Sequence, residues 1–278
     1  MALIPPFFID CVVAIGLQTT QNGNPTKSWI GTGFLFGNFI SSDPNKPDTR
    51  NYQVYLVTNK HVLHNQKNII LRFNPQNGQP ATDFPAALEE PNGNKLWTVH
   101  LNADTDVAVL PINIQFIRDA GMKFDIFKSD SDILLKQQLE DNQVSEGDFI
   151  FVLGFPRGMM PTDRQHVIVR NGIIARIRDL YENRSSGYII DSLVFPGNSG
   201  GPVIYKPEIV SIQETPALNR AALIGIVKSY IPYQDVAISQ QTQRPRIIFE
   251  ENSGLANVET VDKIIETIQA DVTRKTIA

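Results

Sequence analysis

Short runs of apolar and β-branched residues alternate with turn-forming residues along almost the whole chain. Clear examples are residues 8–15, 54–58, 107–110 and 149–154, which are flanked by Gly, Pro, Asn or Asp. Runs of about four to eight such residues between turn signals are typical of β-strands. Many short strands in succession predict an all-β fold of the sandwich or barrel type.

One segment near the C-terminus has a different periodicity. Apolar side chains recur there at helical spacing, at Val258, Val261, Ile264, Ile265 and Ile268. A stripe that repeats every three or four residues predicts an amphipathic α-helix, and we expect it to pack on the body of the protein. A shorter helix is expected within residues 130–139, where Ser and Asp can act as caps.

Several stretches are expected at the surface. Residues 41–51 and 74–94 are rich in Pro, Asn and Asp and are predicted to be exposed, mobile loops. Residues 206–220 and 233–247 are predicted to be polar insertions.

Composition and charge narrow the function classes. The chain has 278 residues, one cysteine and a formal net charge of −4. This length suffices for one large or two small cores, and the charge gives no indication of a nucleic-acid or anionic-membrane partner. Cys11 cannot form an intramolecular disulfide and is expected to be a buried strand thiol. No Cys/His cluster has the spacing of a metal site.

The apolar N-terminus lacks the pattern of a targeting segment. No positive region precedes residues 2–17, and Pro5, Pro6 and Asp10 interrupt them. They therefore predict neither a signal peptide nor a transmembrane helix, and we expect a cytoplasmic location.

The most distinctive motif is Pro-Gly-Asn-Ser-Gly-Gly-Pro-Val at residues 196–203. Gly197, Gly200 and Gly201 permit a tight backbone path that side chains would block. Such a path can aim several N–H groups at one point beside the Ser199 hydroxyl. Acyl transfer needs this combination of a nucleophile and an oxyanion hole, although a purely structural glycine-rich turn is the alternative.

The order of the residues selects among the serine hydrolases. All four histidines precede Ser199, namely His61, His64, His100 and His166. The Gly-x-Ser-x-Gly spacing also fits α/β-hydrolases, but their histidine follows the serine, so that class is excluded. The order His, Asp, Ser remains possible. His61 is favoured as the base because residues 54–58 form a predicted strand that delivers it at its end.

The acid is expected in the segment Asp-Thr-Asp-Val-Ala-Val-Leu at residues 104–110. Asp106 directly precedes the predicted strand and is preferred, since a buried carboxylate behind an imidazole is the orienting member of a triad. Asp104 is the second candidate and could instead cap a turn.

These segments together resemble the three catalytic blocks of chymotrypsin-fold serine peptidases. They are most similar to those of the bacterial HtrA (high-temperature-requirement) branch, at residues 58–62, 104–110 and 196–202. Further segments resemble other strands of that fold in matching order, at residues 31–36, 146–156, 171–175 and 223–227. The resemblance spans roughly residues 8–232.

The resemblance implies an all-β fold of two packed antiparallel β-barrels with a C-terminal α-helix. The implied division is residues 1–115 for the first barrel with His61 and Asp106, 116–145 for a linker, 146–250 for the second barrel with Ser199, and 251–278 for the helix. HtrA proteins usually carry a PDZ domain after the protease domain, and we expect none here.

The resemblance also assigns roles to individual residues. Ser199 would be the nucleophile, His61 the general base and then acid, and Asp106 the group that orients the imidazole. The backbone N–H groups of Gly197 and Ser199, with Asn198 between them, would form the oxyanion hole. No metal and no cofactor would be needed, and the partner would be a protein or peptide substrate.

Specificity is expected to be apolar. In this fold the residue six before the nucleophile lies at the base of the primary pocket, which is Leu193, with Val194 and Phe195 beside it. The strand along the cleft would supply Val227, Lys228, Ser229 and Tyr230. A charged side chain would lose hydration in such a pocket without gaining a partner. Asp191 lies nearby and leaves a basic preference open.

A catalytically silent, peptide-binding scaffold of the same fold is the alternative function, because a fold does not guarantee activity. Silent relatives tend to lose a triad residue, whereas this chain has a candidate for each of the three positions.

Overall fold

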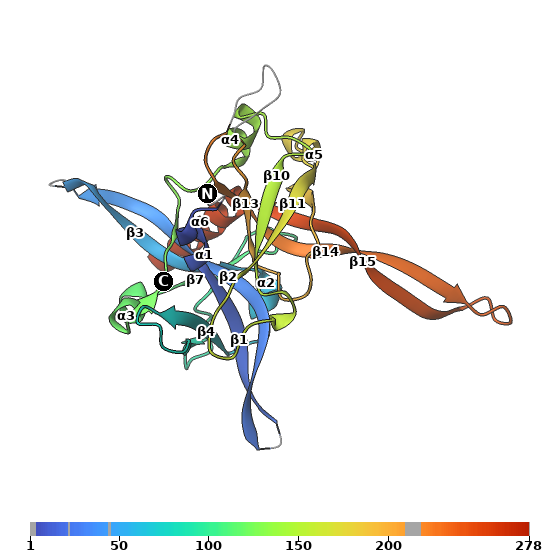
Figure 1. Cartoon of the computed structure of the whole chain (residues 1–278), viewed down its shortest axis with the longest axis horizontal. Helices are drawn as coiled ribbons and strands as arrows, with labels where there is room; N and C mark the ends of the chain where they lie inside the picture. The colour runs from blue at the N-terminus through green and yellow to red at the C-terminus, as the bar shows by residue number, and fades with distance from the viewer. Residues whose placement is uncertain (1–3, 22, 44–45, 209–217, 278) are drawn as a thin grey trace.

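The computed structural model of the protein describes residues 4–21, 23–43, 46–208 and 218–277. It is mostly β-structure and ends in a long helix (Figure 1), as the sequence predicts.

The N-terminal strands are β1 Val12–Gln21, β2 Asn24–Asp43, β3 Lys46–Thr58, β4 Asn68–Pro75, β5 Thr82–Ala87, β6 Thr98–Val99, β7 Ala108–Pro111, β8 Met122–Lys123 and β9 Phe127–Lys128. The C-terminal strands are β10 Phe149–Gly154, β11 Ile168–Arg176, β12 Gly187–Asp191, β13 Pro202–Tyr205, β14 Ala222–Ile238 and β15 Pro245–Thr260. The helices are α1 Pro6–Asp10, α2 Lys60–Leu63, α3 Ile114–Asp119, α4 Lys136–Asp141, η1 Pro156–Gly158 (a 3₁₀ turn), α5 Arg178–Tyr181 and α6 Val261–Ile277.

The C-terminal half forms a closed barrel with the strand order β10, β11, β12, β15, β14, β13. Side chains alternate across each strand. Ile150 and Val152 of β10 therefore belong to the barrel core, whereas Phe151 and Leu153 belong to a core shared with the N-terminal half. The predicted second barrel is confirmed.

The N-terminal half is a nine-stranded sheet on an open path, so the prediction of a closed first barrel is not met. The path is β5-β4-β1-β2-β3-β7-β6, with β8 beside β4 and β9 beside β2. Within the described residues, its two ends are joined by a bridge between Glu89 and Lys95, a 3.0 Å hydrogen bond from Leu96 N–H to Leu88 O and a 2.8 Å hydrogen bond from Glu90 N–H to Asn94 O. Pro91 lies beside this bridge and lacks the N–H group that a longer ladder would need.

The two halves share one apolar core. Phe34 from β2, Phe151 from β10, Ile204 from β13 and Ile264 from α6 all contribute to it. Helix α6 thus packs on the body of the protein, as its apolar stripe predicts. Cys11 is also buried in this core, and burial raises the pKa of its thiol.

Two predicted boundaries move. Strand β15 continues to Thr260 as part of the barrel, so residues 251–260 are strand and helix α6 begins only at Val261. The predicted linker, residues 116–145, supplies β8 and β9 to the N-terminal sheet. In the described part of the chain, no helix has the length and apolar character needed to cross a membrane.

Long hairpins extend beyond both sheets (Figure 1). Hairpins β1–β2 and β2–β3 project from the N-terminal half, and β14–β15 projects from the barrel. Of residues 41–51, predicted as a loop, residues 41–43 lie in β2 and 46–51 in β3, and residues 44–45 lie outside the described residues; β5 lies within the predicted loop 74–94. Residues 233–247, predicted as a polar insertion, lie in the β14–β15 hairpin, which exposes large apolar side chains. Of the other predicted insertion, residues 209–217 lie outside the described residues.

Candidate active site

The side chains of His61 and Asp106 are hydrogen-bonded to each other. His61 Nδ1 lies 2.5 Å from Asp106 Oδ2, and the His61 backbone N–H donates to Asp106 Oδ1 at 3.1 Å. The His61 side chain is 50% exposed, because it lies in the short helix α2 directly after the buried strand β3. Pairing through Nδ1 assigns the proton to that nitrogen and leaves Nε2 free to accept one.

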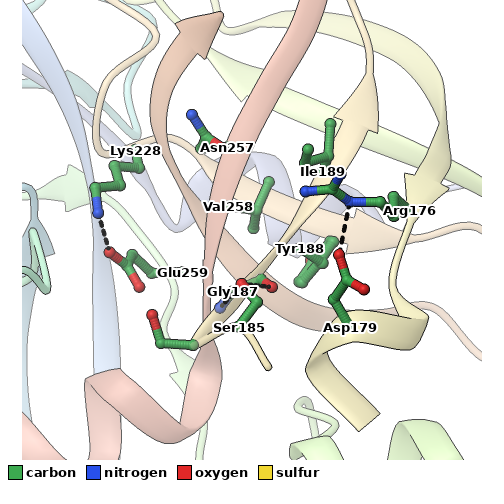
Figure 2. Close-up of a pocket in the computed structure, with 11 residues that line it drawn as sticks. Arg176, Asp179, Ser185, Gly187, Tyr188, Ile189, Lys228, Asn257, Val258 and Glu259 are labelled. Atoms are coloured by element: carbon green, nitrogen blue, oxygen red, sulfur yellow. Dashed lines mark hydrogen bonds and ion pairs between the residues drawn. The ribbon is translucent and has the colours of Figure 1, made fainter. Parts of the chain in front are cut away.

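Asp106 is held in place by both halves of the molecule. Buried Asn59 donates from Nδ2 to Asp106 O at 2.6 Å. From the barrel, Glu259 of β15 accepts a 3.2 Å hydrogen bond from Asp106 N–H. Lys228 of β14 forms an ion pair with the Glu259 carboxylate at 2.9 Å (Figure 2). The Lys228 ammonium also donates to Asp104 O at 2.8 Å. Glu259 is only 2% exposed, so its buried charge is both paired and hydrogen-bonded.

Ser199 lies in a tight turn between β12 and β13. Gly197 and Gly200 have φ angles of +98° and +82°, in the left-handed region that favours glycine. An added Cβ would lie 2.4 Å from Phe155 O at Gly197 and 2.1 Å from Thr32 O at Gly200. Dihedral angle and close approach therefore both require glycine at these two positions.

Thr32 of β2 connects the nucleophile turn to its surroundings. Its hydroxyl donates to Gly197 O at 2.6 Å and accepts from Phe155 N–H at 3.0 Å. Its backbone N–H donates to Ser199 O at 3.0 Å, and the Thr58 hydroxyl donates to Thr32 O at 2.8 Å. One fully buried residue thus ties the end of β3, the end of β10 and the Ser199 turn together.

Two backbone N–H groups of the turn, those of Gly197 and Ser199, donate a hydrogen bond to no acceptor among the described residues. Their neighbours are fixed, because Arg157 N–H donates to Pro196 O at 2.6 Å and Asn198 N–H donates to the carbonyl three residues earlier at 2.9 Å. Asn198 itself is 1% exposed, so its side chain supports the turn from inside. Free, pre-positioned N–H groups of this kind can stabilise an oxyanion.

The Ser199 turn adjoins the helix that carries His61. Gly31 lies between them: a Cβ there would lie 2.8 Å from Cγ1 of Val62, the residue after His61, and 3.5 Å from Ser199 O. No hydrogen bond joins the Ser199 hydroxyl to His61 in the described part of the chain. Catalytic hydrogen bonds are often long without substrate and tighten in the complex.

The three residues predicted at the base of the specificity pocket separate in the structure. Leu193 is 51% exposed and, with Asp191, lines a cavity of about 640 Å³ against β10 and β11. Val194 is 2% exposed and belongs to the barrel core. The Phe195 ring lies 5.2 Å from the Arg170 guanidinium. Leu193 and Val194 thus differ sharply in exposure, and the specificity pocket stays a prediction.

The predicted cleft strand runs beside the nucleophile turn. Val227 N–H donates to Gly201 O at 2.9 Å, and Val227 O accepts from Gly200 N–H at 3.1 Å. Ser229 is exposed, and the Tyr230 hydroxyl donates to a carboxylate of the β14–β15 hairpin at 2.6 Å. The backbone of β14 therefore runs directly alongside the Ser199 turn.

The other candidates take no part in this arrangement. His64 and His166 are exposed, and the Asp104 carboxylate makes no hydrogen bond among the described residues. His100 is buried and its Nε2 lies 2.6 Å from Glu266. Burial acts to raise the pKa of Glu266, but hydrogen bonds from His100 and Lys263 outweigh it and lower the pKa overall. Within the described ranges, no three His, Cys, Asp or Glu side chains converge as metal ligands.

Sequence comparison places the chain in a family. A model of the trypsin-like peptidase domain matches residues 31–207, which is more than half of the chain, so the chain belongs to the trypsin-like peptidase domain family. Among solved structures it is similar to the protease domain of MamO from Magnetospirillum magneticum in its apo form. The identity is 15%, the match covers 94% of this chain and 96% of that chain, and the TM-score is 0.47. A search of curated proteins found no match.

Sequence reasoning missed three residues that hold the site: Thr32, Lys228 as a partner of the acid loop, and Glu259. Thr32 was visible only as the centre of Gly31-Thr32-Gly33, a segment singled out for its glycines. Glu259 follows Val258 at the end of a strand, and a lone carboxylate in a buried run is the signal that could have indicated a paired, structural charge.

Proposed function

We propose that this chain is a serine endopeptidase of the HtrA-like branch, which hydrolyses proteins or peptides through an acyl-enzyme. The observation that carries the proposal is the 2.5 Å contact between His61 Nδ1 and Asp106 Oδ2, next to a Ser199 turn with two free N–H groups. Membership of the trypsin-like peptidase domain family supports it.

In this proposal His61 Nε2 accepts the proton of the Ser199 hydroxyl as Oγ attacks the substrate carbonyl. The N–H groups of Gly197 and Ser199 stabilise the resulting oxyanion, and Asp106 stabilises the imidazolium. The imidazolium then protonates the leaving amine as the peptide bond breaks. Water, deprotonated by the same imidazole, hydrolyses the acyl-enzyme and restores the Ser199 hydroxyl.

Hydrolysis of a denatured protein substrate by purified variants tests the proposal. Ser199→Ala and His61→Ala should both abolish turnover, because triad members act as a unit. His64→Ala is the matched control, since that histidine is exposed and lies outside the arrangement; it should retain wild-type activity. EDTA should have no effect. A wild-type protein that binds peptide without cleaving it would support the silent scaffold instead.

A further inference from the structure

The outer part of the β14–β15 hairpin, residues 230–252, forms a two-stranded arm that projects from the barrel (Figure 1). Both strands of the arm expose large apolar side chains: Tyr233, Val236, Ile238, Ile247, Ile248 and Phe249 are between 41% and 61% exposed. A bare two-stranded ribbon gains little stability from its own contacts. Exposed apolar patches of this kind mark interaction surfaces.

One edge of the arm is free. On one side, Pro245 and residues 247–252 of β15 pair with β14, with a register shift at Arg246 between them, whereas β12 contacts β15 at residues 255–259. Among the described residues, no other strand pairs with this outer stretch of β15. A free edge presents N–H and C=O groups that can pair with another strand.

The sequence of this edge is complementary to itself. Residues 246–250 read Arg-Ile-Ile-Phe-Glu, with a cation at one end, an anion at the other and apolar residues between them. If two copies of the strand pair antiparallel about Ile248, Arg246 lies opposite Glu250 twice, Ile247 lies opposite Phe249 twice, and Ile248 faces its own copy. Opposite charges and large apolar residues are favourable cross-strand pairs.

We propose that the chain forms a two-fold symmetric dimer by antiparallel pairing of the 246–250 edges of two arms, centred on Ile248. The occupant of the free edge is thus a second copy of this chain. The pairing joins the two arms into a four-stranded sheet and makes Ile247, Ile248 and Phe249 of the two copies cross-strand neighbours. A two-fold interface requires a surface that complements itself, and this register supplies one.

The charges of the arm are available for this pairing. Arg246 makes no ion pair in the described part of the chain. Glu250 accepts hydrogen bonds from Tyr230 at 2.6 Å and from Gln234 at 3.2 Å, one on each oxygen. A carboxylate has about four lone-pair sites, so it can still accept an arginine. Pro245 has no N–H group and ends the stretch that can pair.

Sedimentation equilibrium of the full chain tests the proposal independently of any peptidase activity. The wild type should be a dimer that dissociates more readily at high salt. Arg246→Glu and Glu250→Arg should each raise the dimer dissociation constant roughly tenfold or more, because like charges then face each other twice. An equimolar mixture of the two variants should form a heterodimer, since every facing pair is again opposite in charge. A monomeric wild type, or a mixture that stays monomeric, would overturn the proposal.

A cysteine at the symmetry axis tests the register. Ile248→Cys should form an intermolecular disulfide under mild oxidation, because directly opposite residues lie within bridging distance. Val236→Cys is the matched control: it lies opposite Ile248 on the inner strand, so its copy in the dimer is about three strand spacings away. The natural Cys11 is buried and should not contribute. Equal cross-linking of the two variants would contradict pairing about Ile248.

Discussion

The backbone N–H of Asp106 donates a 3.2 Å hydrogen bond to Oε1 of Glu259, so the acid of the proposed triad is positioned by the last strand of the barrel. The same oxygen pairs with Lys228 at 2.9 Å. Because the Asp106 carboxylate is hydrogen-bonded to His61, the placement of the imidazole depends on a buried, paired carboxylate that lies in the other half of the molecule.

Removing the Glu259 acceptor should therefore slow catalysis. Glu259→Leu leaves Asp106 N–H without its partner, and we expect kcat to fall about tenfold, or roughly 1.4 kcal/mol, with KM little changed. Glu259→Gln keeps an acceptor oxygen and should retain most of the rate. Steady-state kinetics, with each variant assayed at the same concentration of folded protein, measures these changes in kcat and KM. Equal losses in both variants, matched by equal losses of thermal stability, would assign Glu259 a purely structural role.

Thr32 should be needed for the shape of the oxyanion hole. Thr32→Val removes the hydroxyl that donates to Gly197 O and accepts from Phe155 N–H, while it preserves the size of the side chain. We expect kcat to fall by roughly 10–100-fold, somewhat less than the loss of an oxyanion donor itself. Thr32→Ser keeps the hydroxyl and is the control. A Val variant as fast as the Ser variant would show that the turn keeps its shape without this hydroxyl.

The buried ion pair between Arg72 and Asp83 should make stability depend on pH. Asp83 pairs with Arg72, whose side chain is 7% exposed, at 2.6 Å. Burial acts to raise the pKa of Asp83, but hydrogen bonds from Arg72 and Lys27 outweigh it and lower the pKa. A lowered folded-state pKa contributes stability above the unfolded value of about 4, and this contribution is lost as pH falls through the folded pKa.

Asp83→Asn should consequently lower the free energy of unfolding by about 3 kcal/mol at pH 7, because it leaves a buried Arg72 charge unpaired. The difference from the wild type should shrink below about pH 4. Lys27→Ala is the control, since Lys27 is 47% exposed and its pair should contribute less than about 1 kcal/mol. Urea unfolding between pH 3 and pH 7 measures both variants. A constant difference across that range would contradict the assignment.

Cleavage is expected after apolar residues. Phe195 lies just before the Ser199 turn and Val227 is joined to that turn by backbone hydrogen bonds, and we expect apolar residues here to disfavour a charged substrate side chain, which would lose hydration. Profiling with a peptide library measures the preference. A profile dominated by Arg or Lys would contradict the expectation and point to Asp191, which shares a cavity with Leu193.

Local pattern was enough to predict an all-β fold and a C-terminal helix, and the resemblance to chymotrypsin-fold peptidases implied the closed barrel and the segments that meet at the candidate site. His61 and Ser199 were predictable from short motifs. His61 follows a run of apolar strand residues, and Ser199 lies among glycines that a tight turn requires. The open N-terminal sheet was not predictable, because its two ends are joined by a few contacts between residues 88–90 and 94–96 that exist only after folding. Residues such as Thr32 and Glu259 were missed since their partners lie far away in the chain and exist only after folding. Leu193 was placed by its distance in sequence from Ser199, which does not determine the direction of its side chain.

Labelling of the full chain with a fluorophosphonate probe tests the central claim most directly, because this reagent reports an activated serine without knowledge of the substrate. Intact mass and peptide mapping identify the labelled residue. We predict one adduct per chain on Ser199, no adduct in Ser199→Ala, and strongly slowed labelling in His61→Ala, with His64→Ala labelled as fast as the wild type. A wild-type chain that stays unlabelled, or is labelled elsewhere, would contradict the assignment of Ser199 as a nucleophile activated by His61 and Asp106.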